Sequence, residues 1–199
     1  LPVEQKQAYL KAREQCPHLI EKESHPLLFL KHAEFDVWAA VQSFVGFWEL
    51  RVELLTEERA FLPLNLTGKG AIDDKTCKWI ESGAVAILPK NKYGNAQILL
   101  DTRKCPSGDQ HASNLLWLKA VFALKVLLAQ RATSEGYSTL YFHNDVAHGI
   151  FQGYAWYKEK FRKIPLKYKG VWALVLDESK AKWLEANKGT FSEKLNPVF

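Results

Sequence analysis

The residues best suited to catalysis form one short cluster that follows a predicted strand. His143 is followed directly by Asn144 and Asp145, and His148 lies three residues further on. Active sites of open α/β sheets lie at the carboxyl ends of parallel strands, which is where this cluster is expected. A histidine and an aspartate there have the chemistry of a base and its orienting group, with Cys105 as a distant nucleophile. The simpler interpretation, which we favour, is a strand-to-helix turn made by Asn144 and Asp145.

Motifs of well-defined enzyme classes are missing from the sequence. It contains no phosphate-binding glycine loop, no Gly-x-Ser-x-Gly elbow and no His-Glu-x-x-His helix. The three cysteines, Cys16, Cys77 and Cys105, have no paired spacing and are interpreted as free thiols in a reducing compartment. Residues 1–14 lack the pattern of a signal peptide, and the absence of any Met suggests a trimmed or processed piece. We therefore expect a cytoplasmic, non-enzymatic protein without metal or cofactor.

The positive charge of the chain is concentrated near its carboxyl end. Residues 1–149 carry 17 basic and 17 acidic side chains, whereas residues 150–199 carry 10 and 5. A broad basic face that binds nucleic acid is therefore not expected. Residues 158–169 alternate apolar side chains with Lys158, Lys160, Arg162, Lys163, Lys167 and Lys169. This pattern predicts contact with an anionic membrane surface; the alternative is an ordinary solvated helix end, where basic residues are favoured.

The first 60 residues have the patterns of helices. Residues 4–14 read as a short polar helix, which Pro17 prevents from continuing. Residues 25–33 and residues 37–55 are expected to form two antiparallel helices, with Asp36 as the N-cap of the second. The apolar face of the first of these two is expected to be Leu27, Leu28 and Leu30. The stripe expected on the second is Trp38, Val41, Phe44, Val45 and Trp48.

The pattern changes after a loop at residues 61–70. Asp73 or Asp74 is expected to cap a short helix, which ends before Gly83. Two short apolar runs then predict a β-hairpin with a loop longer than two residues. The predicted order of the remaining segments is hairpin strands 85–88 and 96–101, helix 113–134, strand 137–143, helix 150–163, strand 171–176 and a last helix to residue 187. Strands separated by helices imply parallel crossovers, so we predict an α/β fold with a mixed, mostly parallel sheet covered by helices.

The order of these elements and several segments resemble the CRAL-TRIO (Sec14-like) lipid-binding family. The most specific match is residues 27–37, Leu-Leu-Phe-Leu-Lys-His-Ala-Glu-Phe-Asp-Val, followed by Phe-Trp-Glu-Leu-Arg at residues 47–51. The hairpin turn at residues 92–96, the strand 139–143 and Ile-Pro-Leu-Lys at residues 164–167 resemble later family segments. The resemblance implies a helical unit over residues 1–60 and a lipid-binding domain over residues 61–199.

The resemblance also implies an apolar cavity between the sheet and a gate helix. Lys188 in Lys-Gly-Thr-Phe resembles the lysine of a Lys-Pro-Phe stretch in phosphatidylinositol binders, although the proline is missing here. The chain departs from the family in lacking an acidic residue at Ala155 and a closing strand after Phe199, and in its polar gate helix. It is therefore interpreted as a shortened or divergent member. The ligand-binding residues predicted for it are Tyr141, Trp172, Trp183, Lys188 and Phe191.

Aromatic residues are abundant, with seven Trp, seven Tyr and eleven Phe, and are expected to divide between the core and a ligand cavity. We therefore predict a carrier that binds and transfers or presents a hydrophobic ligand, most simply a lipid. Docking on membranes is predicted through residues 158–169 and the last helix. The alternative is a Sec14-like protein-interaction module, of the kind associated with regulators of small GTPases, that does not exchange lipid.

Overall fold

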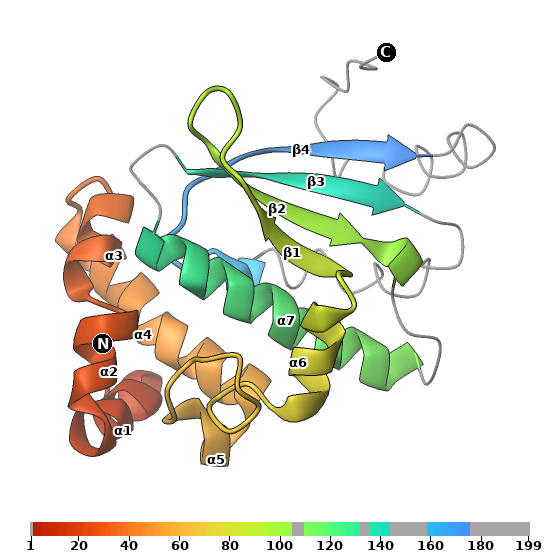
Figure 1. The fold of residues 1–199 in the computed structure, drawn as a ribbon. Helices are drawn as coiled ribbons and strands as arrows, with labels where there is room; N and C mark the ends of the chain where they lie inside the picture. Colours follow the sequence, from red (N-terminus) through yellow and green to blue (C-terminus); the bar gives the residue numbers. More distant parts are fainter. Residues whose placement is uncertain (1, 105–109, 132–135, 144–158, 176–199) are drawn as a thin grey trace.

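The protein is described by a computed structural model. The structure describes residues 2–104, 110–131, 136–143 and 159–175. The chain begins with helices and continues into a sheet (Figure 1). The elements are η1 (Val3–Lys6), α1 (Gln7–Gln15), α2 (Pro17–Glu23), α3 (Pro26–His32), α4 (Val37–Leu55), α5 (Glu57–Ala60), α6 (Asp74–Glu81), β1 (Val85–Leu88), β2 (Ala96–Asp101), η2 (Thr102–Lys104), α7 (Gln110–Arg131), β3 (Tyr137–His143) and β4 (Tyr168–Val175).

The sheet has four strands in the order β1-β2-β3-β4. Strand β1 is antiparallel to β2, whereas β2, β3 and β4 are parallel to one another. The prediction of an α/β fold with a mixed, mostly parallel sheet is therefore confirmed. The bounds of β1, β2 and β3 are those expected from the sequence, but β4 begins three residues earlier than expected. Among the described strands, β4 lies at the edge of the sheet.

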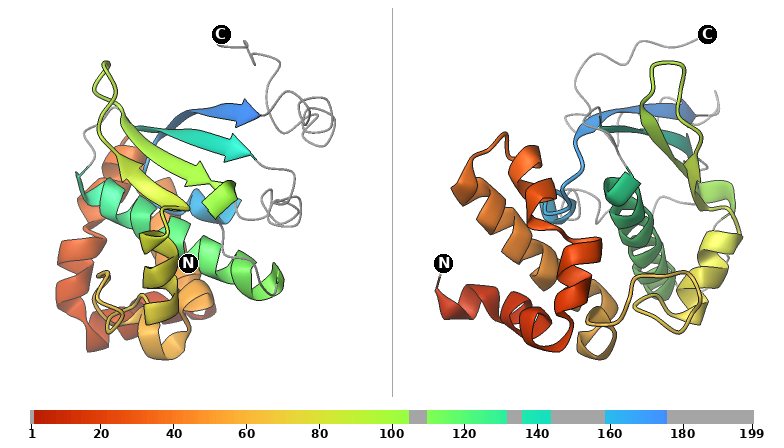
Figure 2. Two further views of the ribbon diagram at one scale, coloured as in Figure 1. Left: turned by 45° about the vertical axis from the view of Figure 1, so that its right-hand side comes forward. Right: turned by 60° about the vertical axis from the view of Figure 1, so that its left-hand side comes forward.

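Helix α7 lies between the sheet and the layer formed by α1–α5 (Figure 2). Its Trp117, Leu118 and Phe122 are all buried. The ring of Phe122 stacks on Phe47 of α4 with centroids 5.9 Å apart. One continuous cluster of buried side chains extends from α1 through α7 to the sheet. A helix enclosed by two layers needs apolar residues on most of its sides.

The predicted helix boundaries are confirmed where a capping side chain marks them. Asp36 Oδ1 accepts a hydrogen bond from the amide of Ala39 at 3.0 Å, and α4 begins at the next residue after Asp36. Asp73, rather than Asp74, caps α6, because its Oδ1 accepts from the amide of Thr76 at 2.7 Å. Two helices were not anticipated from the sequence. Pro17 was expected only to end a helix, but it occupies the first turn of α2, and α5 is a single short turn.

Arg51 of α4 is fully buried and joins three segments of the helical layer. Its Nη1 donates to the carboxylate of Glu23 on α2 at 2.6 Å. Its Nε and Nη2 donate to the carbonyls of Ala60 and Leu62 at 2.5 Å and 2.6 Å. The second carboxylate oxygen of Glu23 accepts from the amide of Leu64 at 2.7 Å. One ion pair therefore fixes α2, α4 and the chain after α5 relative to one another.

We predict that Arg51→Met lowers the free energy of unfolding by about 3–5 kcal/mol, because it leaves the carboxylate of Glu23 buried without its partner. The side chain of Glu23 is only 10% exposed. The double variant Arg51→Met/Glu23→Gln, which removes both charges, should recover part of this loss. Urea unfolding measures both effects. A loss below about 1 kcal/mol in the single variant would contradict the assigned role of this pair.

Candidate ligand-binding surface

The two faces of the sheet differ in what covers them. Along each strand successive side chains point to opposite faces, and paired residues share a face. Ile98, Leu100, Tyr137 and Tyr141 are buried on one face. The ammonium of Lys125 on α7 lies 5.2 Å from the ring centroid of Tyr137. This face therefore packs against α7.

The opposite face carries an apolar row that crosses all four strands. Ala86 pairs with Leu99, Leu99 with Leu140, and Leu140 with Trp172. The first three are half-buried, and Trp172 is 53% exposed. The helices labelled in Figure 1 all lie on the other side of the sheet. The apolar row is therefore a surface that no helix of the described part of the chain covers.

The predicted ligand-binding residues Tyr141 and Trp172 do not lie together. Tyr141 pairs with Ala173 on the neighbouring strand, whereas Trp172 pairs with Leu140. Because the faces alternate along a strand, Tyr141 faces α7 and Trp172 faces away from it. Tyr141 is only 4% exposed. The two side chains therefore cannot line one cavity, and of this pair the apolar row includes only Trp172.

A charged group lies at the carboxyl ends of the parallel strands, next to the apolar row. Arg103 donates to both carboxylate oxygens of Asp101, from Nε and from Nη2, each at 2.8 Å. These hydrogen bonds hold the pKa of Asp101 below its usual range. The guanidinium carbon also lies 4.5 Å from the ring centroid of Phe142. The sequence analysis did not single out this group, because ion pairs between near neighbours have no distinctive sequence pattern.

The predicted membrane-binding segment is largely neutralised by acidic partners. Lys160 forms an ion pair with Glu53 of α4. Arg162 pairs with Glu159 at 2.9 Å. The segment was expected to present all its cations to a membrane, and the structure does not show this. Lys167 is also paired, at 3.4 Å from Glu34 in the turn between α3 and α4, and Lys158 lies outside the described residues.

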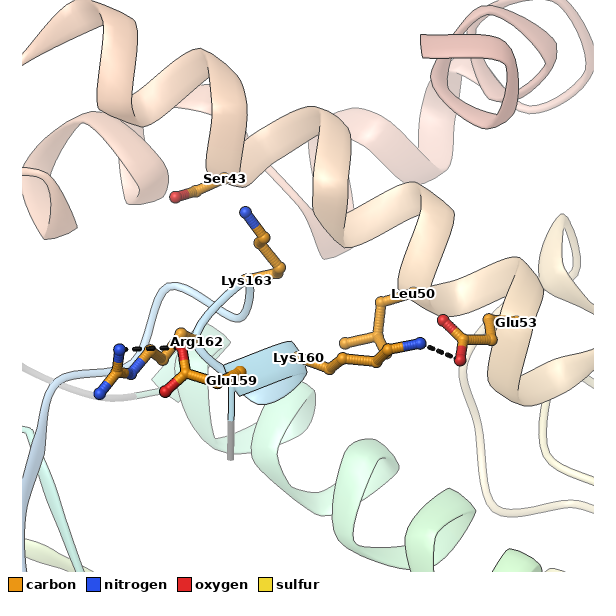
Figure 3. Close-up of a pocket in the computed structure, with 7 residues that line it drawn as sticks. All are labelled: Ser43, Leu50, Glu53, Glu159, Lys160, Arg162 and Lys163. Atoms are coloured by element: carbon orange, nitrogen blue, oxygen red, sulfur yellow. Dashed lines mark hydrogen bonds and ion pairs between the residues drawn. The ribbon is translucent and has the colours of Figure 1, made fainter. Parts of the chain in front are cut away.

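A cleft of about 370 Å³ lies between residues 159–163 and α4, and side chains of both segments line it (Figure 3). Figure 3 shows Ser43 and Lys163 toward one end of the cleft and the ion pair of Lys160 and Glu53 at the other. The side chain of Lys163 packs closely on Gly46 of α4. A Cβ atom added at Gly46 would lie only 2.9 Å from the Cδ atom of Lys163. Lys163 and Lys169 form no ion pair with any residue that the structure describes. Among the described residues, these two cations of residues 158–169 have no acidic partner.

An exposed apolar patch lies where α3 turns into α4. We define the α3–α4 patch as five side chains with exposed fractions from 38% to 66%: Leu27, Phe35, Val37, Trp38 and Val41. Trp38 and Val41 were expected in the apolar stripe of α4, and this was wrong, because both are exposed. The other residues of that stripe, Phe44, Val45 and Trp48, are buried as expected. Leu27 was likewise expected to face inward on α3, where Phe29 is the buried residue.

The backbone between α3 and α4 holds part of this patch in a strained conformation. Glu34 and Phe35 have φ values of +53° and +68°, in the left-handed region that residues with a Cβ seldom adopt. The amide of Phe35 donates to the carbonyl of Leu30 at 2.9 Å, which closes the end of α3. Phe35 is 66% exposed as a result. Residues with a Cβ that are held in this conformation cluster at functional sites, so the patch is a candidate functional surface.

Lys125 is the described basic group with the most perturbed pKa. Burial among apolar side chains lowers the pKa of its ammonium to about 7. The ammonium lies 4.7 Å from the ring centroid of Phe161 and 5.2 Å from that of Tyr137. These rings favour the charged form and oppose part of the effect of burial. Lys125 packs under the α7-facing side of the sheet, so it is not part of the apolar row.

Several predicted residues lie outside the described part of the chain. His143 is the last residue of β3, and the residues predicted to act with it are not described. The predicted residues outside the described ranges are Cys105, Asn144, Asp145, His148, Lys158, Trp183, Lys188 and Phe191.

The two described cysteines, Cys16 and Cys77, are buried and unpaired, and burial raises the pKa of both thiols.

Within the described ranges, no three side chains of His, Cys, Asp or Glu come together in an arrangement that would hold a metal ion. None of the described helices combines the length and the apolar composition needed to cross a membrane.

A scan against protein-family models and a search of curated protein sequences each found no match.

Proposed function

We propose that this protein is a non-enzymatic carrier that binds a hydrophobic ligand, a lipid, against the sheet face bearing the apolar row. The observation that carries this proposal is the row itself, with Trp172 53% exposed at its end. Parallel strands are normally buried on both faces, since their connections place helices there. Here α7 covers one face, and the other presents leucine and tryptophan.

The energetics favour an apolar occupant on this face. Covering apolar surface contributes about 25 cal/mol of favourable binding free energy for each Å² removed from water. A lipid chain is long and flexible, so it is able to follow a row that crosses four strands. On the same face, Gln97 and Ser138 pair with each other one row to one side of Leu99, and Asp101 lies one row to the other side. A ligand with a long apolar part fits this arrangement better than a compact polar one.

The resemblance to the CRAL-TRIO family supports the same function. That family encloses one ligand between its sheet and a gate helix, after an N-terminal helical unit. The order of described elements here, helices followed by a mixed sheet with α7 on one face, is compatible with a Sec14-like arrangement. Under this proposal Trp183, Lys188 and Phe191 remain predicted ligand-binding residues, and the protein is cytoplasmic and peripherally associated with membranes.

We predict that Leu140→Glu weakens lipid binding at least about tenfold, because it places a charge at the centre of the apolar row. The probe is a phospholipid with a fluorescent acyl chain, and the measurement is fluorescence polarisation at increasing protein concentration. The control is Leu66→Glu, which makes the same chemical change at an exposed leucine of the loop before α6. Thermal unfolding followed by circular dichroism establishes that both variants are folded. Equal binding by wild type and Leu140→Glu, or no binding by wild type, would contradict the proposal.

Membrane docking is proposed through the α3–α4 patch rather than through the ion-paired cations of residues 158–169. Aromatic side chains of an interfacial surface enter the boundary of a bilayer, and nearby cations attract anionic headgroups. Lys31 on α3 lies next to the patch. Lys163 and Lys169, which form no ion pair with a described residue, add positive charge within residues 158–169. This modifies the prediction from sequence, which placed docking on residues 158–169 and the last helix; the last helix lies outside the described residues.

We predict that Phe35→Ala/Trp38→Ala lowers partitioning onto vesicles of phosphatidylcholine and phosphatidylserine at least about tenfold, since both rings would lose apolar burial. Sedimentation with the vesicles measures the bound fraction. The matched control is Tyr93→Ala, which removes an aromatic ring that is 69% exposed on the β1–β2 hairpin next to Lys92. Wild-type binding that the double variant leaves unchanged would exclude the patch from the membrane contact.

The second candidate function is a protein-interaction module. The α3–α4 patch is also the observation that favours it, because aromatic residues are enriched in protein interfaces. The vesicle experiment separates the two functions. A patch with no affinity for vesicles of any composition, in a protein that takes up no lipid, would favour a protein partner.

A further inference from the structure

Arg103 is a fixed cation at the end of the surface proposed to bind lipid. Asp101, which holds it, is 2% exposed, whereas the side chain of Arg103 is 50% exposed. Both oxygens of the carboxylate accept hydrogen bonds from one edge of the guanidinium. The plane of the guanidinium lies near the ring of Phe142. A buried carboxylate and a ring thus hold the charge in place before any ligand arrives, which lowers the entropy lost on binding.

The position of this cation follows from the register of the strands. Asp101 pairs with Phe142, two residues beyond the pair of Leu99 and Leu140. Alternation along β2 and β3 places all four side chains on the face that bears the apolar row. Arg103 follows directly in η2, at the carboxyl ends of the parallel strands. In open α/β sheets this edge is where ligands bind.

The guanidinium retains donors for a ligand. Arginine has five N–H groups, and the bonds to Asp101 use those of Nε and one on Nη2. Within the described ranges, Nη1 of Arg103 has no hydrogen-bond partner. An oxyanion approaching from solvent would meet these groups directly, since charge-assisted hydrogen bonds to carboxylate and phosphate are what a guanidinium forms best.

We infer that the ligand is an anionic amphiphile, whose carboxylate or phosphate head pairs with Arg103 and whose chain lies along the apolar row. This inference rests on the proposed function, because it assigns the head of the lipid that the row would bind. The shared chemistry of the two possible heads is an oxyanion with two or more acceptor oxygens.

The experiment compares ligands that share one chain and differ only in the head. Displacement of a neutral fluorescent lipid probe is measured with oleate against oleyl alcohol, and with lysophosphatidate against monoolein. The wild type is expected to bind each anionic ligand about tenfold or more tightly than its neutral counterpart. The stronger of the two anions identifies the head. Inorganic phosphate at millimolar concentration tests a free anion, and it should displace no probe and leave the preference for the anionic chains intact.

The decisive variant is Arg103→Met/Asp101→Asn, which removes the cation without leaving a buried charge unpaired. It should lose the preference for anionic heads and keep its affinity for oleyl alcohol. Arg103→Lys should retain part of the preference, because it keeps the charge and loses the two-pronged geometry. Arg13→Met is the control, since Arg13 is an exposed arginine on α1, away from the sheet. Thermal unfolding of every variant establishes that it is folded.

The outcomes separate this inference from the function on which it rests. Equal binding of anionic and neutral ligands by the wild type, or an unchanged preference in the double variant, would overturn the role of Arg103 while lipid binding stands. Binding of phosphate without any anionic amphiphile would also overturn it. Failure of the wild type to bind any of the four ligands or the probe would instead contradict the proposed function.

Discussion

The buried ion pair of Arg51 and Glu23 is the interaction on which the position of the other elements depends. It fixes α2 and the segment after α5 against α4, and the guanidinium lies over the ring of Trp48 at 5.1 Å from its centroid. Phe47, next in sequence to Trp48, stacks on α7. Helix α7 then covers one face of the sheet. The ion pair thus anchors the helical layer against which α7, and through it the sheet, is packed.

The described helices all lie on one side of the sheet, so they leave the proposed site on the other face unenclosed. The connection from β2 to β3 passes through α7, and the segment before β4 packs on α4 on the same side of the sheet. Right-handed crossovers that proceed in one direction along a sheet place their helices on one face. Leu99, Leu140 and Trp172 are therefore left on the other. On that face, the chain of an anionic lipid would cover the apolar row and its head would pair with Arg103.

Turn and capping residues in the sequence predicted the helices and strands well. The contacts of individual side chains could be learned only from the structure. The turn residues between β1 and β2 and the caps at Asp36 and Asp73 act within a few residues, so the sequence alone located them. The face to which Tyr141 points depends on the strand register, and the acid that pairs with Lys160 lies 107 residues away. Trp38 was misplaced because α4 is apolar around much of its surface, so helical spacing did not separate its buried face from its exposed one.

The central claim is that one lipid occupies the sheet face that α7 leaves uncovered. Native mass spectrometry of the protein purified under mild conditions, before and after incubation with a total lipid extract, tests it most directly. We predict a second mass peak that exceeds the bare chain by the mass of one lipid, in a single copy per chain. A spectrum that shows only the bare chain, before and after exposure to lipid, would contradict the account.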